Sequence, residues 1–268
     1  MRPPVSATLA VWANAWLDGA VGYDDVLDAV TVGAENHVVI DLPASQAARL
    51  GRGDGPAHGD LDADNRPEPA RLGAVLIAWR TSSEPVRACL PVPGDVRGTP
   101  ADPGFRAAAL DAGEGVFAGG IGLVPVPRPD SPSSAPAVTV WRAFAVAPPG
   151  PDALQLSEAE HDLAAAVRET ATLLRERDLA AHRPPDTREL ERIRRASEGL
   201  RLPTGFPPRA AALLASAERL QAMLSLAALD GHGGGIDRVG IDARAGALRE
   251  LATTVRRARL AGYNAPRR

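Results

Sequence analysis

An imidazole and a carboxylate lie close together in the segment His37–Leu42, which is rich in β-branched residues and predicts a strand. Alternate residues of a strand point to the same side, so His37, Val39 and Asp41 are expected to share one face. A carboxylate beside an imidazole is a typical acid–base pair in enzymes. We therefore take His37 and Asp41 as the candidate catalytic residues.

Two arginines follow directly after tryptophans in other predicted strands, Arg80 after Trp79 and Arg142 after Trp141. If these side chains converge on His37, they form an anion-binding site for a small molecule, and they are the candidate ligand-binding residues. The same neighbours are also typical of structural cation–π contacts. The sequence leaves both interpretations open.

All 30 basic residues of the 268-residue chain are arginines. Without lysine the chain cannot form a Schiff base, supply the lysine of a P-loop or a protein kinase, or carry a Ser-x-x-Lys pair. Its one cysteine, Cys89, excludes an internal disulfide and any multi-thiolate metal centre. Cys89 lies in an apolar segment and is expected to be an inert buried thiol.

The composition is dominated by alanine, arginine, glycine and proline, a bias that resembles proteins of GC-rich bacteria such as actinobacteria. This resemblance implies that codon usage accounts for the missing lysine. No apolar run reaches the roughly 20 residues of a membrane span. Asn14 interrupts the first apolar stretch, which disfavours a signal peptide. We expect a cytoplasmic protein without a membrane segment.

Two patterns resemble incomplete metal sites. Glu158 and His161 are spaced to share a helical face, but the sequence lacks the second such pair and the extra glutamates of a di-iron bundle. Asp60, Asp62 and Asp64 alternate like the start of a calcium loop, but the glycine and the bidentate glutamate required further on are absent. We expect no metal and no cofactor.

Glycines gather in the segments Gly113–Gly122 and Gly231–Gly235. The first lacks the Gly-x-Gly-x-x-Gly spacing of dinucleotide-binding loops, and the second follows a predicted helix where such a loop follows a strand. Both segments predict turns, the second at a helix end.

Arginines of the C-terminal half fall on two predicted helix faces. These arginines are Arg188, Arg192 and Arg195 on one helix, and Arg249, Arg256 and Arg259 on another. Glutamates are interleaved with them, so the net positive field is weak and nucleic-acid binding is disfavoured, although it stays an alternative.

The N-terminal half predicts an α+β domain with flanking helices. Leu9, Trp12, Trp16 and Leu17 have helical spacing and predict one buried face, and Tyr23–Val30 and Phe105–Asp111 predict two further helices. The predicted strands are His37–Leu42, Leu72–Arg80, Val86–Val92, Gly120–Val126 and Ala137–Val146. A hairpin turn is expected at Thr81–Pro85, and the sheet is expected to be mostly antiparallel with about five strands.

The C-terminal half predicts a bundle of about four helices. Capping boxes at Ser157/Glu160 and Asp186/Glu189 open the first two. The third follows Pro207–Pro208 and is the most apolar. The fourth covers Ile241–Leu260, with Leu248, Leu251, Val255 and Ala258 in a heptad-like stripe.

A domain boundary is expected at the proline-rich segment Ala147–Pro151, which separates domains 1–150 and 151–268. Residues 1–150 hold 11 arginines against 17 acidic residues, and residues 151–268 hold 19 against 16. Residues 51–70 are rich in glycine, proline and aspartate and predict a mobile surface loop.

No complete catalytic or cofactor motif is present, whereas two helices of the C-terminal half are apolar enough to offer an interaction surface. The leading hypothesis is therefore a cytoplasmic, non-enzymatic interaction or scaffold protein that acts through its helical C-terminal half. Its expected partner is another protein or a second copy of the chain. A small-molecule enzyme or anion-binding site on the sheet, and a nucleic-acid-binding regulator, are the alternatives.

Overall fold

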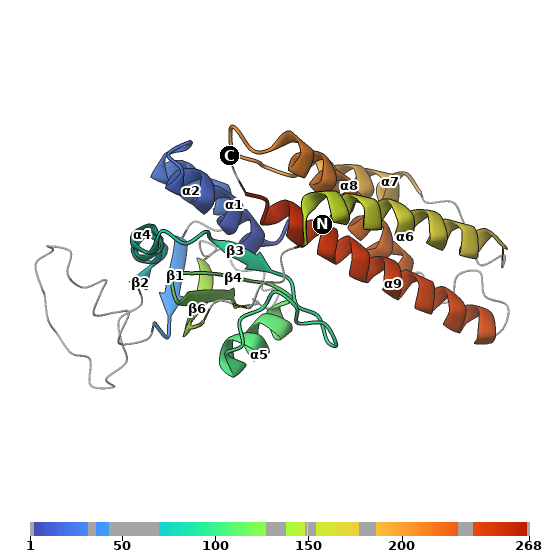
Figure 1. Cartoon of the computed structure of the whole chain (residues 1–268), viewed down its shortest axis with the longest axis horizontal. Coiled ribbons are helices and arrows are strands. Elements are labelled where there is room, and N and C mark those ends of the chain that lie inside the picture. The colour runs from blue at the N-terminus through green and yellow to red at the C-terminus, as the bar shows by residue number, and fades with distance from the viewer. Residues whose placement is uncertain are drawn as a thin grey trace, which may run out of the picture. The chain divides into compact units, whose positions relative to one another are not determined.

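The computed structural model describes residues 3–31, 36–42, 70–126, 138–147, 149, 154–176, 186–229 and 238–266. The chain divides into two compact units, one of residues Pro4–Asp152 and the other mainly of residues Ala153–Arg268 (Figure 1). The first unit combines helices with a sheet, and the described elements of the second are helices. The predicted α+β fold with a C-terminal group of helices is confirmed. The loop predicted for residues 51–70 lies outside the described residues, except for Ala70 in a strand.

The sheet has six described strands in the order β2-β1-β6-β5-β4-β3. Their bounds are Asn36–Ile40 (β1), Ala70–Arg71 (β2), Arg87–Cys89 (β3), Gly115–Ala118 (β4), Ile121–Pro125 (β5) and Val138–Ala145 (β6). Each neighbouring pair is antiparallel except β1 and β6, which are parallel with Val39 opposite Trp141. The strands predicted around β1, β5 and β6 are therefore confirmed, and so is the mostly antiparallel sheet.

The strand predicted for Leu72–Arg80 is wrong, because this segment belongs to helix α4, Leu72–Ser82. Its buried residues Leu72, Val75, Leu76 and Trp79 follow the helical spacing i, i+3, i+4, i+7. A short apolar run fits a buried strand and a buried helix equally well when periodicity is the only guide. The burial of one helical face against the rest of the unit selects the helix.

The hairpin turn predicted at Thr81–Pro85 is also wrong, because helix α4 extends to Ser82. The hydroxyls of Thr81 and Ser82 donate to the carbonyls of Ala78 and Trp79 at 2.7 and 2.8 Å, within the last turn of α4. Ser83 then has a positive φ of 56°, which ends the helix. The strand that follows, β3, pairs with β4 and is shorter than predicted.

The glycines of the segment 113–122 have two different roles. Gly113 ends helix α5 (Pro103–Ala112) with a positive φ, and Gly119 and Gly120 turn between β4 and β5. Gly115, however, lies inside β4, where a turn was predicted, and Gly122 lies inside β5, within the predicted strand Gly120–Val126. A Cβ at Gly122 would be 2.6 Å from the ring of Phe105, so these glycines let α5 pack closely on the sheet.

Helix α1, Val5–Leu17, lies against the sheet with a face of small residues. Its buried residues are Ser6, Ala7, Leu9, Ala10, Val11, Ala13 and Ala15. The predicted helix is confirmed, but its predicted buried face is wrong, because Trp12, Trp16 and Leu17 are only half-buried. Alanines allow a helix to approach a sheet closely, and the tryptophans are thereby left at the margin of the contact. Helix α2, Tyr23–Val30, follows α1 and packs against it.

Asn14 ties α1 to the chain just before β3. Its Oδ1 accepts a hydrogen bond from the backbone N–H of Val86 at 2.8 Å, and its Nδ2 donates to the Val86 carbonyl at 2.7 Å. Val86 is 1% exposed, so its backbone groups depend on this one side chain for hydrogen bonds that water would otherwise supply.

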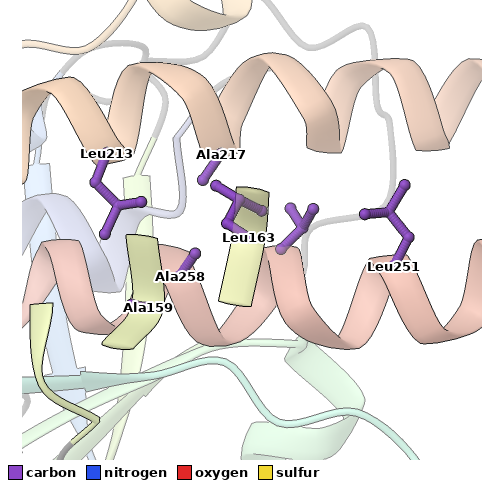
Figure 2. Close-up of a cluster of buried hydrophobic side chains, with 7 residues drawn as sticks. Ala159, Leu163, Leu213, Ala217, Leu251 and Ala258 are labelled. Atoms are coloured by element: carbon purple, nitrogen blue, oxygen red, sulfur yellow. The ribbon is translucent and has the colours of Figure 1, made fainter. Parts of the chain in front are cut away.

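The C-terminal unit has four described helices, in agreement with the predicted number. They are α6 (Leu156–Glu176), α7 (Thr187–Glu198), α8 (Pro208–Leu229) and α9 (Arg238–Tyr263). Helix α9 packs against both α6 and α8, and α7 packs against α8. The shared core consists of Ala159, Leu163, Leu213, Ala217, Leu251, Val255 and Ala258 (Figure 2). None of the helices in the described part of the chain is long and apolar enough to cross a membrane.

One of the two predicted capping boxes forms. Asp186 accepts from the N–H of Glu189 at 2.9 Å, and Glu189 accepts from the N–H of Asp186 at 2.8 Å. The box predicted at Ser157/Glu160 is wrong, because Glu158 accepts from the Gln155 N–H at 3.2 Å and α6 begins at Leu156. The carboxylate of Glu160 instead binds Arg209 on α8, whose guanidinium lowers the pKa of Glu160.

Replacing Asn14 tests the tie between α1 and Val86. Asn14→Leu removes both hydrogen bonds and leaves two buried backbone groups unpaired, so we expect the free energy of unfolding to fall by about 2–4 kcal/mol. Urea unfolding followed by tryptophan fluorescence measures this unit, because Trp12, Trp16, Trp79 and Trp141 all lie in it. Asp111→Ala, an exposed change on α5, serves as the control. An Asn14→Leu protein as stable as this control would contradict the assignment.

Candidate functional site

The candidate residues of β1 and β6 lie on both faces of the sheet. The two strands are parallel, with His37 opposite Thr139 and Ile40 opposite Arg142. Side chains alternate along a strand, so Trp141 shares a face with His37, and Arg142 points to the other face. This alternation separates the imidazole from the guanidinium that was expected to bind an anion beside it.

His37 binds Trp141 directly. The indole Nε1–H of Trp141 donates to Nδ1 of His37 at 2.9 Å, so Nδ1 carries no proton. The other ring nitrogen, Nε2, is buried and has no hydrogen-bond partner among the described residues. Burial lowers the pKa of His37, and a backbone contact at Val30 opposes part of this effect. The imidazole is therefore held in its neutral form.

Asp41 pairs with Arg142, which was not among the predicted contacts of this carboxylate. The Nε of Arg142 lies 3.3 Å from Oδ2 of Asp41, and both side chains are about half exposed. Asp41 has a positive φ of 60° directly after β1, so its side chain departs from the strand alternation that would place it beside His37. The contacts described here do not join His37 and Asp41, and their catalytic role stays a prediction.

Trp79 and Arg80 lie on α4 and serve different contacts. Trp79 is fully buried, and its Nε1–H donates to the carbonyl of Ile121 in β5 at 3.4 Å. The guanidinium of Arg80 lies 5.1 Å from the ring centroid of Trp16. A cation–π contact of an arginine was expected on the sheet, but the structure shows it between α4 and α1.

Arg80 belongs to a group of side chains that the sequence did not single out. The ring of Tyr23 meets Trp16 edge to face at a centroid distance of 6.0 Å. The Tyr23 hydroxyl lies over Gly73, in the space that a Cβ at this position would fill. We call Trp16, Tyr23, Gly73, Ile77 and Arg80 the α1–α2–α4 surface. The sequence did not indicate this group, because Leu72–Arg80 was predicted as a strand and only a helix brings residues 73, 77 and 80 to one face.

Cys89 is a buried free thiol, as expected. Burial raises its pKa to about 12. A thiol with so high a pKa carries almost no thiolate at neutral pH, so Cys89 is a poor nucleophile.

The described residues contain no group of three histidines, cysteines or acids that could hold a metal ion. Glu158 and His161 lie in the first turns of α6, where Glu158 caps the helix. The aspartates Asp60, Asp62 and Asp64 and the segment Gly231–Gly235 lie outside the described residues.

Of the three arginines that were assigned to one face of the last helix, two are buried. Arg256 and Arg259 are only 6% and 9% exposed, so they cannot reach a phosphate backbone. The Nε of Arg259 donates to Glu218 of α8 at 2.7 Å, and the Tyr263 hydroxyl donates to the same oxygen at 2.7 Å. Burial, reinforced by the Glu218 charge, raises the pKa of Tyr263. This buried network uses arginine to join two helices.

Two family models match the chain. The model described as "Rv1486c-like protein, N-terminal domain" matches residues 6–155, and the corresponding C-terminal domain model matches residues 157–260. The Mycobacterium tuberculosis protein Rv1486c of strain H37Rv is 31% identical over 97% of this chain and 96% of its own length. The Mycobacterium leprae protein ML1804 is 30% identical with the same coverage. Both relatives carry the description "uncharacterized protein". No solved structure matches the chain.

The buried neutral His37 predicts a pH dependence of stability. Its pKa is lowered in the folded chain, so below about pH 6.5 the unfolded chain binds a proton that the folded chain does not. The free energy of unfolding should therefore fall as the pH falls. Because His37 is partly screened by water, the slope should stay below the limit of about 1.4 kcal/mol per pH unit for one proton.

His37→Gln keeps an acceptor for Trp141 but cannot titrate, so we expect it to flatten this pH dependence. Urea unfolding followed by tryptophan fluorescence from about pH 7.5 to about pH 5 measures the effect. His161→Gln, a change at an exposed histidine of α6, is the matched control. Identical slopes in the unmodified chain and His37→Gln would contradict the prediction.

Proposed function

The chain belongs to the Rv1486c-like family over nearly its whole length, and from this premise we propose that it is a cytoplasmic, non-enzymatic interaction protein that binds a protein partner through its C-terminal helical unit. The family match carries no activity with it, so the support comes from the described surfaces. A free, buried Cys89 agrees with a compartment in which stability does not require disulfides.

The observation that carries the proposal is the half-covered apolar side of α7. This helix packs mainly against α8, and its apolar residues Leu190 and Ile193 share one face. Leu190 is nevertheless 53% exposed, and Met223 on the neighbouring α8 is 41% exposed. Contact with an apolar partner surface would remove Leu190 from water, which is favourable at about 25 cal/mol per Å² of apolar area.

Ion pairs on the polar side of α7 stabilise this helix while their side chains stay exposed to water. Arg194 pairs with Glu198 at 3.1 Å and Arg195 with Glu191 at 2.9 Å, both across one helical turn. Pairs of this spacing stabilise an exposed helix. These pairs leave the apolar side of α7 as its feature best suited to a protein contact.

The heptad-like stripe of the last helix does not contribute to such a surface. Leu251, Val255 and Ala258 are buried in the core that α9 shares with α6 and α8 (Figure 2). The expectation that this stripe offers an interaction surface is therefore replaced by the proposal for α7.

Site-specific photo-cross-linking in a lysate of the source organism tests the proposal. Arg188→Cys puts a single reactive thiol on the exposed side of α7 for a benzophenone maleimide, because the buried Cys89 has too high a pKa to react. We expect a covalent adduct with a partner protein. Leu190→Glu in the same labelled chain should reduce its yield about tenfold, because a carboxylate must lose its water in an apolar contact.

Thr187→Glu is the matched control, since it adds the same charge in the first turn of the same helix, where an acid is favourable. It should leave the adduct unchanged. Absence of any adduct, or equal adduct yields from the Leu190→Glu and Thr187→Glu chains, would count against α7 as the binding surface.

A further inference from the structure

We draw no further inference here: the strongest candidate, the α1–α2–α4 surface of the N-terminal unit with its exposed Ile77 and the Arg80 guanidinium over the Trp16 ring, carries nothing further, because nothing in the described part of the chain shows what covers it.

Discussion

The contact between α1 and the sheet is the constraint on which the N-terminal unit depends. Alanines on the buried face of α1 allow a close approach, and Asn14 then supplies the hydrogen bonds that Val86 would otherwise lack. At the start of the helix, the Ser6 N–H donates to Glu114 at 2.7 Å. With both ends of the contact tied by polar groups, the position of Trp16 follows, and with it the site of Arg80 and Tyr23. The arrangement of the α1–α2–α4 surface is thus a consequence of how α1 is packed.

In the helical unit, a buried charged network joins two helices. Glu218 is 2% exposed, and a carboxylate so deeply buried is costly unless it is paired. Arg259 and the Tyr263 hydroxyl both donate to it, so α8 and α9 are joined by a network that leaves this arginine no part in an external contact. Helix α7 packs against α8 and keeps Leu190 exposed. In the described part of the unit, a buried ion pair joins α8 and α9, and α7 carries an exposed apolar side chain.

Sequence patterns predicted long elements well and contacts poorly. The strands around His37 and Trp141 were recognised from their β-branched residues, but their parallel pairing depends on topology that no local pattern contains. Likewise, strand alternation predicted that Asp41 shares a face with His37. In the structure Asp41 has a positive φ and pairs with Arg142 instead. The sequence could not show which arginines of a predicted helix face are buried. Arg259 is buried because it pairs with Glu218, which lies 41 residues away in the chain.

The sequence by itself determined the α+β class with its C-terminal helices, the absence of lysine chemistry and of an internal disulfide, and the buried nature of Cys89. These follow from composition and from periodicities that act within one element. Only the tertiary structure decided that Leu72–Arg80 is helical and that Arg80 meets Trp16. The physical reason is that a short apolar run is stable as a helix or as a strand, and the partner surface that buries it selects between them.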